Sequence, residues 1–333
     1  LMNLSKLTSW NSEELNKTKM KELDFSNYKV LIVGDVMLDK YYFGQVERIS
    51  PEAPVPIVNI HKEESRLGGA SNVANNIASL GGQTLLCGTI GHDFFGREIE
   101  NISHRRHIHT FLLRTSNPTI TKARIIGGKQ QIVRVDYEEK NGLSENEKQQ
   151  LKEKISQALP EYHILVISDY GKGLISEDFC CYLVRLAQNQ GKKVIIDPKG
   201  KNWKKYMGAD IITPNVKELS DIVGYSVPNT DQAIEKAARE AMETNQLTSL
   251  LVTRSEKGMS LIGDFPPLHI PTHSEEVFDV SGAGDTVVAT LSICLAAGMD
   301  IIDAIKTANI AAGIVVKKIG TATLTREELA PLL

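Results

Sequence analysis

Residues 279–286 read Asp-Val-Ser-Gly-Ala-Gly-Asp-Thr and lead directly into a long apolar segment. The small residues Gly282, Ala283 and Gly284 allow backbone N–H groups to converge at the start of a helix, where the partial positive charge favours an anion. Asp285, beside this anion hole, is placed to take a proton from a hydroxyl group that attacks a phosphate. A glycine-rich turn capped by Asp285 is the alternative, but the full pattern is far more restrictive than a bare Gly-x-Gly.

A second cluster, Gly68-Gly-Ala-Ser-Asn-Val-Ala-Asn-Asn76, opens another amphipathic segment. Gly68 and Gly69 permit a ligand to approach the backbone closely, and Asn72 offers an amide that both donates and accepts hydrogen bonds. These properties suit the recognition of sugar hydroxyls. A capped helix after a tight turn explains the same residues equally well, so both interpretations stay open.

Short β-branched strands alternate with amphipathic helices along most of the chain. This order predicts a mostly parallel sheet with helices on both faces, whose ligands bind beyond the carboxyl ends of the strands. Strands are expected at 28–34, 84–88, 163–168, 193–196, 210–213 and 249–253, and helices at 68–81, 144–158, 176–190, 215–223, 230–245, 284–298 and 301–318.

Two further segments have a different pattern. Residues 40–66 alternate and are interrupted by prolines, which is typical of edge strands because proline cannot donate to a central ladder. Residues 119–136 hold two β-rich runs around Gly127-Gly-Lys-Gln130, which predicts a hairpin. We expect both segments to form one small sheet that acts as a lid above the site.

Composition excludes several classes of protein. Lys and Arg number 38 against 41 Asp and Glu, a formal net charge of −3, so no global positive field is present to bind nucleic acid or an acidic membrane.

The four cysteines lack Cys-x-x-Cys spacing and are expected to be reduced thiols in a cytoplasmic protein. The longest apolar stretch, 286–299, is shorter than the about 20 residues that a membrane span requires, and the polar leader, 1–27, lacks the pattern of a signal peptide. Neither Gly-x-Gly-x-x-Gly after the first strand nor a Walker motif is present, which excludes those two nucleotide-binding routes.

The chain resembles the ribokinase-like (PfkB) family of carbohydrate kinases, because the stretches at 68–81 and 279–286 match its two signatures in the expected order and separation. The resemblance is greatest to the branch that phosphorylates heptose 7-phosphate. It implies a three-layer α/β/α sandwich with a small β-sheet lid over residues 28–325, followed by a tail at 326–333. The segments that carry it are GDVMLDKYYFG (34–44), RISPEAPVP (48–56), QQIVRVDYEE (130–139), SDYGKG (168–173), DPKG (197–200), TPNVKE (213–218) and VTRSEKGMSL (252–261).

The family's site residues transfer to matching positions. The resemblance makes Asp285 the catalytic base and Asp39 an acceptor for sugar hydroxyls, although a surface turn would also explain Asp39. Asn215 and Glu218 would order the water ligands of magnesium, a role that is compatible with capping a helix. The expected nucleotide-binding residues are Asn215, Val216, Lys217, Glu218, Thr253, Arg254, Gly258, Gly282, Gly284 and Asn309, of which Asn309 would lie near the adenine. Many relatives have glycine at the position of Ser255, so no ATP contact is assigned to it.

A phosphorylated substrate needs basic residues at its far end, although each basic candidate could also be a solvated surface charge. Lys172 is the first choice because it follows a strand end next to Asp169, where the sugar is expected. The other candidates are Lys199, Arg124 and Arg134, whereas Lys201, Lys204 and Lys205 are expected to form an exposed face.

The resemblance implies ATP-dependent, magnesium-requiring phosphorylation of D-glycero-β-D-manno-heptose 7-phosphate at its anomeric hydroxyl. The product would be the 1,7-bisphosphate, on the way to ADP-heptose for lipopolysaccharide. A homodimer that pairs through the small sheets is expected. A different sugar kinase of the same fold and a non-catalytic sensor are the alternatives, and a monovalent cation near Asp279 and 312–324 stays open.

Overall fold

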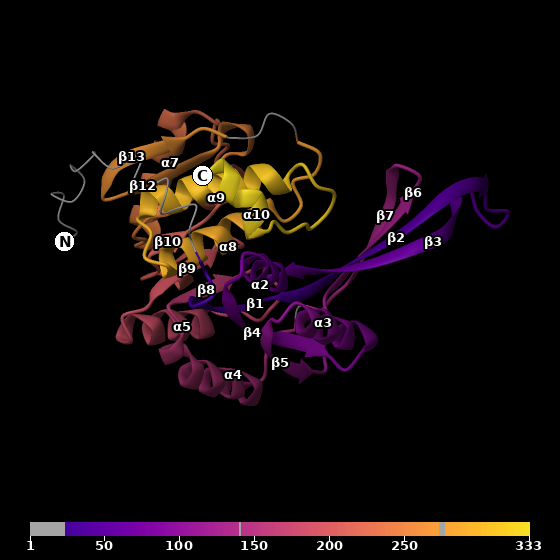
Figure 1. Cartoon of the computed structure of the whole chain (residues 1–333), viewed down its shortest axis with the longest axis horizontal. Coiled ribbons are helices and arrows are strands. Elements are labelled where there is room, and N and C mark those ends of the chain that lie inside the picture. Colours follow the sequence, from indigo (N-terminus) through magenta and orange to yellow (C-terminus); the bar gives the residue numbers. More distant parts are fainter. Residues whose placement is uncertain (1–23, 140, 273–276) are drawn as a thin grey trace.

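Aliphatic runs build a nine-stranded sheet at the centre of the molecule (Figure 1). The computed structural model describes residues 24–139, 141–272 and 277–333, so most of the predicted leader lies outside the described residues. The strand order is β13-β12-β11-β10-β9-β8-β1-β4-β5, parallel except at β12 and β13. The strands are β1 (Lys29–Gly34), β4 (Gln83–Gly91), β5 (His109–Thr115), β8 (Ile164–Ser168), β9 (Lys193–Asp197), β10 (Ile211–Ile212), β11 (Leu250–Thr253), β12 (Met259–Gly263) and β13 (Phe265–Ile270).

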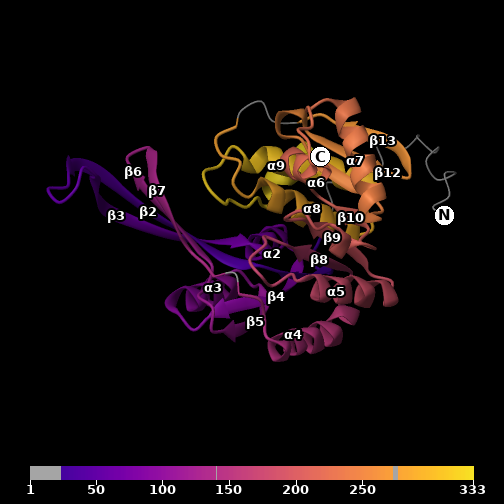
Figure 2. The same cartoon turned by 180° about the vertical axis from the view of Figure 1, so that it is seen from behind.

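Helices cover both faces of this sheet, as the strand sequences require. In β1, Val30 and Ile32 pack into one hydrophobic cluster, whereas Leu31 and Val33 pack into the other because successive side chains point to opposite faces. Figures 1 and 2 show α8 and α9 on one side of the sheet and α4 and α5 on the other. The helices are α2 (Ala70–Ser79), α3 (Phe94–Arg105), α4 (Glu145–Ala158), α5 (Glu177–Asn189), α6 (Val216–Val223), α7 (Asp231–Asn245), α8 (Ala283–Ala296), α9 (Ile301–Val315) and α10 (Arg326–Leu329).

A second sheet of four strands projects from the body as a long arm (Figures 1 and 2). Its order is β3-β2-β6-β7, so 40–66 and 119–136 do pair in one small sheet. The edge-strand prediction is wrong for β2, which is bonded on both sides. The prolines fall in the connection at the tip of the arm and at the first residue of β3, where no ladder bond is lost. The strands are β2 (Val36–Ile49), β3 (Pro56–Gly69), β6 (Thr121–Gly127) and β7 (Gln130–Tyr137).

Several elements were not predicted. The strands β12 and β13 form a hairpin at one edge of the central sheet, and β13 contains two prolines, which the edge position tolerates. At the opposite edge, the residues of β5 are themselves exposed or half-exposed except for the last, so the strand lacks the buried apolar run of the inner strands. Helix α3 begins after the N-cap Asp93, whose carboxylate accepts a hydrogen bond from the Gly96 amide at 2.8 Å. Helix α10 has only four residues.

The turn before β12 provides a test of the fold. Gly258 has φ of +80°, and a Cβ there would lie 2.0 Å from the carbonyl oxygen of Ile270. Gly224 has φ of +82° but no neighbour within 4 Å of such a Cβ. Gly224→Ala should therefore cost about 1 kcal/mol of unfolding free energy from backbone strain alone, and Gly258→Ala more than about 3 kcal/mol. Urea unfolding measures both values, and equal losses would contradict the packing of this turn.

Candidate active site

The site lies where the chain changes direction in the central sheet. From β1 the sheet grows through β4 to β5 on one side, and β8 then pairs with β1 on the other. The carboxyl ends of β1 and β8 therefore lie side by side, and ligands of open α/β sheets bind at such a point. Asp35, directly after β1, accepts hydrogen bonds from the backbone amides of Tyr170 at 2.8 Å and Lys172 at 3.1 Å. Asp35 thus fixes the loop after β8.

Asp35 was not among the predicted site residues. Its side chain is buried, and burial raises its pKa to about 6 although the backbone N–H groups favour the charged form. The only signal in the sequence is an acidic residue after the glycine that ends the first strand. That signal indicates a loop contact as readily as a ligand contact.

Asp285 lies in the first turn of α8 and is almost completely buried. Its two carboxylate oxygens accept hydrogen bonds from the hydroxyl of Tyr170 at 2.6 Å and from the side-chain amide of Asn72 at 2.8 Å. Burial raises the pKa of Asp285 to about 6, and the two donors act in the opposite direction. This carboxylate is therefore oriented by its neighbours and charged at neutral pH, and Tyr170 is a site residue that the sequence reasoning missed.

The two glycine-containing motifs meet at this carboxylate. The amide of Asn76 donates to the side-chain oxygen of Asn72 at 3.2 Å, so the Asn72 amide nitrogen is turned towards Asp285. The hydroxyl of Thr286 donates to Asn76 at 3.2 Å and links α8 back to α2. Gly282 has φ of +79°, and a Cβ there would lie 2.8 Å from the Asn72 amide nitrogen. Glycine is thus required both by conformation and by the close approach of the two helices.

A cavity of about 200 Å³ opens in front of α8. Gly284 lines it, and a Cβ at Gly284 would meet no neighbour within 4 Å, so the backbone at the start of the helix is open to a ligand. Helix N-termini of this kind bind phosphate groups. The lining residues are Asp169, Tyr170, Asp197, Pro198, Lys199, Thr213, Asn215, Glu218, Thr253 and Gly284.

Asn215 and Glu218 form a capping box at the start of α6 and also line the cavity. The Glu218 carboxylate contacts the ammonium of Lys199 at 2.8 Å. Burial, together with the charges of Asp285 and Glu218, raises the pKa of Asp197 well above its usual range. The helix-capping interpretation of Asn215 and Glu218 is therefore confirmed, and their role in ordering the water ligands of magnesium stays a prediction.

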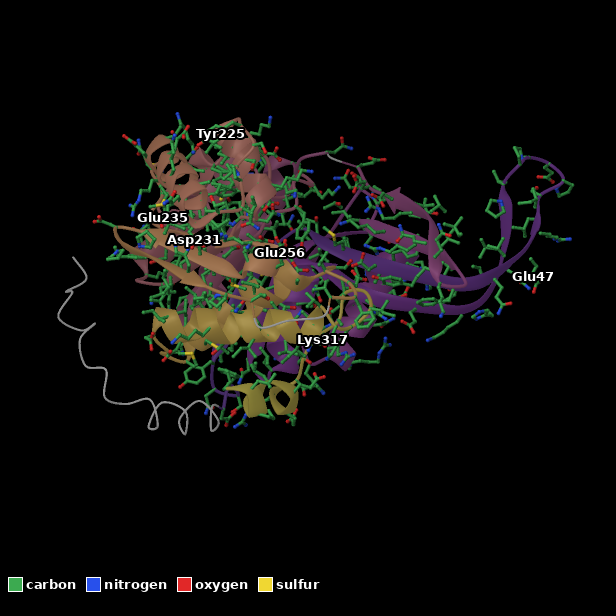
Figure 3. The ribbon with its side chains drawn as sticks, turned by 90° about the horizontal axis from the view of Figure 1, so that it is seen from above. Glu47, Tyr225, Asp231, Glu235, Glu256 and Lys317 are labelled. Atoms are coloured by element: carbon green, nitrogen blue, oxygen red, sulfur yellow. The ribbon has the colours of Figure 1, made fainter. Side chains whose placement is uncertain are left out.

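The remaining predicted nucleotide residues have different positions. Thr253 lines the cavity, but Val216 and Lys217 do not. The Arg254 side chain is buried against Asp231, at 2.6 Å, and the hydroxyl of Ser260, at 2.8 Å. The guanidinium of Arg254 is thus used inside the fold, and the placement of this residue in the nucleotide site stays a prediction. Figure 3 shows Asp231 close to Glu235.

Two of the predicted nucleotide-binding residues, Gly258 and Asn309, instead shape the backbone. Gly258 adopts φ of +80°, and the nearby Ser255 adopts φ of +51°, which explains why glycine suits the position of Ser255. Asn309 donates to the carbonyl of Pro271 at 2.7 Å and so anchors the segment after β13 to α9. Neither Gly258 nor Asn309 lines the cavity.

On the small sheet, Asp39 is buried and pairs with Arg124 at 2.5 Å. It is therefore not in a surface turn. A Cβ on Gly68 would lie 2.7 Å from an Asp39 carboxylate oxygen, and one on Gly69, where φ is +55°, would lie 2.6 Å from the Asp35 carbonyl. The diglycine thus lets the end of β3 pass close to both acidic residues.

One expectation near the loop after β8 is wrong, and another stays a prediction. The Asp169 carboxylate lines the larger cavity and also accepts hydrogen bonds from Lys205 at 2.5 Å and from Tyr206 at 2.7 Å, so its role in sugar binding stays a prediction. Lys205 is accordingly half-buried rather than part of an exposed face. Lys172 forms an ion pair with Glu138, and Arg134 one with Asp136 at 2.8 Å.

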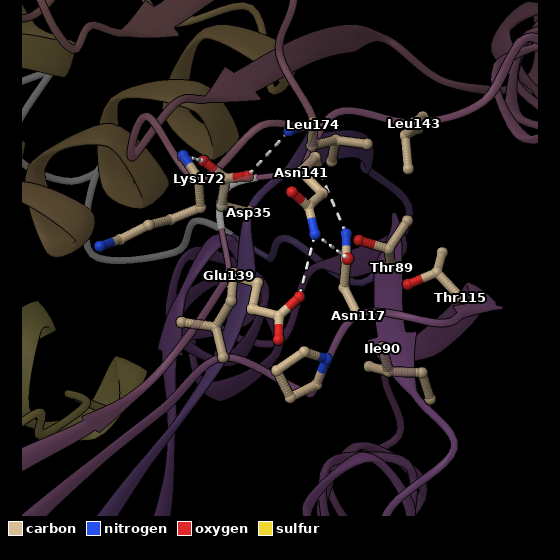
Figure 4. Close-up of a pocket in the computed structure, with 12 residues that line it drawn as sticks. Asp35, Thr89, Ile90, Thr115, Asn117, Glu139, Asn141, Leu143, Lys172 and Leu174 are labelled. Atoms are coloured by element: carbon tan, nitrogen blue, oxygen red, sulfur yellow. Dashed lines mark hydrogen bonds between the residues drawn. The ribbon is translucent and has the colours of Figure 1, made fainter.

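A smaller cavity lies on the other side of Asp35 (Figure 4). Its volume of about 20 Å³ is enough for one water molecule. The side chain of Asn141 donates to Glu139 at 2.9 Å, and that of Asn117 donates to the Asn141 carbonyl at 3.0 Å. Polar side chains thus line most of this small cavity, and we assign no ligand to it.

The residues that face the larger cavity suit magnesium phosphate chemistry. Among residues 24–139, 141–272 and 277–333, no group of three or more His, Cys, Asp or Glu side chains could enclose a metal ion. Mg²⁺ is commonly held by one or two carboxylates, water and substrate phosphates. Glu218 and the neighbouring Asn215 provide oxygen atoms of this kind at the cavity wall.

The chain is also similar in sequence to proteins of known name. The chain is 44% identical to the bifunctional protein HldE of Proteus mirabilis over 92% of its own length and 64% of that protein. It is 47% identical to HldE of Chromohalobacter salexigens over 90% of its length and 62% of that protein. The chain thus spans less than two thirds of the length of these relatives.

Solved structures show the same fold. The phosphofructokinase-2 of Escherichia coli in complex with potassium superimposes with a TM-score of 0.76 at 20% identity, covering 92% of this chain and 98% of the other. The Arabidopsis thaliana ribokinase complexed with ribose and ATP superimposes with a TM-score of 0.71 at 19% identity, covering 92% and 98% of the two chains. The predicted three-layer sandwich with its small sheet is therefore confirmed.

The sequence matches the pfkB family carbohydrate kinase over residues 27–328, which is almost the whole described chain. This match includes both glycine-containing motifs, which the structure joins at Asp285. The chain therefore belongs to the pfkB family of carbohydrate kinases, enzymes that transfer a phosphoryl group from ATP to a sugar.

Proposed function

We propose that the chain phosphorylates D-glycero-β-D-manno-heptose 7-phosphate at its anomeric hydroxyl with ATP, giving the 1,7-bisphosphate and ADP. The observation that carries the chemistry is Asp285, a buried carboxylate oriented by two donors at the open N-terminus of α8. The similarity to HldE proteins over 90% or more of the chain supports the choice of heptose. The segments at 34–56, 130–139 and 168–173 carry the same resemblance.

The proposed reaction uses these residues as follows. Asp285 accepts the proton of the anomeric hydroxyl as that oxygen forms a bond to the γ-phosphorus of ATP. The bond from the γ-phosphorus to the bridging oxygen breaks, and ADP leaves. The backbone of Gly282, Ala283 and Gly284 faces the transferred phosphoryl group and stabilises its charge. Asp39 and Asn72 bind the sugar hydroxyls beside the diglycine.

The nucleotide would lie in the larger cavity, with its triphosphate towards α8. Thr253 lines this cavity, whereas Gly258 and Asn309 shape the backbone of the turn before β12 and of the segment after β13. Asn215 and Glu218 would hold magnesium through water molecules. When bound, the ion neutralises part of the triphosphate charge.

Both carboxylate oxygens of Asp279 already accept backbone N–H groups, from Ser281 at 2.9 Å and Gly320 at 2.8 Å. We therefore leave a monovalent cation out of the proposed reaction, although the phosphofructokinase-2 of Escherichia coli was solved in complex with potassium. No helix in the described ranges has the length and apolar character to span a bilayer. All four cysteines are free thiols, which supports our proposal that the reaction takes place in the cytoplasm.

Asp285→Asn tests the base. The amide keeps the size of the side chain but cannot accept the proton, so kcat should fall by roughly 10²–10⁴-fold while ATP affinity stays within about twofold. A coupled assay of ADP release with heptose 7-phosphate measures kcat, and calorimetric titration measures ATP binding. Asp264→Asn, on the exposed turn between β12 and β13, is the matched control. A turnover close to wild type would exclude Asp285 as the base.

The pH dependence tests how the base is tuned. Because the pKa of Asp285 is raised to about 6 and only the ionised form accepts a proton, kcat/KM should fall as the pH drops through about 6. Tyr170→Phe removes a hydrogen bond that stabilises the ionised form, so this acid limb should move to higher pH by about one unit.

The pH profile of kcat/KM for wild type and variant measures this shift. Tyr225→Phe removes the hydroxyl of an exposed residue that bonds Glu240 and does not line the larger cavity, so it should leave the profile unchanged (Figure 3). Identical profiles for Tyr170→Phe and wild type would show that the Tyr170 hydroxyl does not tune the base.

We also propose a homodimer that pairs through the small sheets. Val133, Val135 and Tyr137 lie at alternate positions of β7, so they share one face, and all three are exposed. Val46 and Ile49 on β2 of the same arm are also exposed, and the far end of the arm is near Glu47 in Figure 3. Exposed apolar side chains that share a strand face favour a protein interface.

The double variant Val133→Lys/Val135→Lys should convert the dimer to a monomer, because four buried charges per interface would be unpaired. Light scattering after gel filtration measures the mass. Phe265→Lys, on the exposed edge strand β13, controls for a general effect of added charge. A wild-type monomer at working concentration would contradict the dimer.

A further inference from the structure

Four basic side chains form a cluster in which burial and charge repulsion lower the pKa of one member, Lys122. The cluster consists of Lys122, Arg124 and Arg134 on the small sheet and Lys172 in the loop after β8. Lys122 lies on β6 opposite Asp39 of β2 and Asp136 of β7. Two residues along, Arg124 lies opposite Arg134, so these side chains share the face that carries Asp39. Lys172, Arg124 and Arg134 all lower the pKa of Lys122. The sequence reasoning had not selected Lys122.

Three of the four cations have a carboxylate of their own. Arg124 pairs with Asp39 at 2.5 Å, Arg134 with Asp136 at 2.8 Å, and Lys172 with Glu138. Among the residues that the structure describes, none offers Lys122 a carboxylate at ion-pair distance. Lys122 is thus the one of these four cations that has no carboxylate of its own at ion-pair distance in the described chain, although the charge of Asp39 raises its pKa and the charge of Lys122 in turn lowers the pKa of Asp285.

The position of Lys122 relative to the base is also defined. Its ammonium lies 5.5 Å from the centre of the Tyr170 ring, and the Tyr170 hydroxyl donates to Asp285 at 2.6 Å. Both Lys122 and the catalytic carboxylate therefore contact Tyr170, and the charge of Lys122 lowers the pKa of Asp285. Burial is the main cause that lowers the pKa of Lys122, followed among the cations by Lys172. A partly buried charge of this kind is stabilised by an anion.

We propose that Lys122 binds the phosphate group already present on the acceptor sugar and so selects sugar phosphates over free sugars. This inference rests on the proposed function, in which the sugar ring extends from its anomeric hydroxyl at Asp285 to a phosphate at its other end. Lysine binds phosphate as a point charge, without the fixed geometry that arginine requires. Arg124, Arg134 and Lys172 add to the positive potential but keep their own carboxylates.

The γ-phosphoryl group of ATP is the other phosphate that Lys122 could reach. The observations favour the acceptor, because Lys122 is on the small sheet and does not line the cavity at α8, whereas Gly284, Glu218 and Thr253 do. The experiment must still separate the two sources of phosphate.

Lys122→Met keeps the length of the side chain and removes its charge. With the full chain, kcat/KM for heptose 7-phosphate should fall about 100-fold, whereas kcat/KM for the unphosphorylated heptose and KM for ATP should stay within about twofold. Lys122→Arg should recover at least a tenth of the wild-type value. Lys129→Met, on the exposed turn between β6 and β7, is the control and should match wild type. Thermal unfolding verifies that all variants fold.

Two outcomes in this assay overturn the inference. Equal losses for both acceptors together with a raised KM for ATP would assign Lys122 to the transferred phosphoryl group. Unchanged kinetics with heptose 7-phosphate would show that Lys122 binds no phosphate of the acceptor.

A binding experiment separates this inference from the proposed function. If the wild type phosphorylates neither heptose acceptor, the proposed function fails, and calorimetric titration with inorganic phosphate becomes the test. Phosphate affinity that falls about 100-fold in Lys122→Met, but not in Lys129→Met, would support a phosphate site at Lys122. Equal affinity in wild type and Lys122→Met, or no binding to either, would overturn it.

Discussion

The Asp285 carboxylate is held between the amide of Asn72 and the hydroxyl of Tyr170, and most of the site is arranged around these two hydrogen bonds. They bring together α8, α2 and the loop after β8, which are far apart in the sequence. Burial raises the pKa of this carboxyl group, and the hydrogen bonds from the two donors lower it. The group can therefore be both excluded from water and ionised near neutral pH, which a general base requires.

Asp35 has the same importance for the loop that carries Tyr170. It lies where β1 ends, and its carboxylate accepts backbone N–H groups of that loop. Because β1 and β8 are neighbouring parallel strands, their ends supply both partners of this contact. The Tyr170 ring then extends from the central sheet towards the small sheet, where Lys122 lies over its face. The loop after β8 thus connects Asp285, the larger cavity and the proposed phosphate site.

Much of the fold could be predicted from periodicity. The boundaries of β1, β8 and α4 agree with prediction to within one residue, because both faces of each strand are buried and Ser144 caps the helix with Glu147. The hairpin of β6 and β7 followed from its glycines. The hairpin of β12 and β13 and the inner position of β2 were missed, since pairing with a distant strand is not encoded in a local pattern.

The sequence by itself determined the chemistry of the site: the glycines at 282 and 284, the carboxylate of Asp285 and the diglycine before Asn72 can be recognised because each satisfies a local backbone requirement. The tertiary structure alone decided which charged groups are available. Asp169 and Lys205 pair with each other and Arg254 pairs with Asp231, whereas Lys122 keeps an ammonium without a carboxylate partner in the described chain. The reason is physical: a charge is available to a ligand only when no counter-charge has been brought next to it, and those counter-charges come from strands and loops distant in sequence.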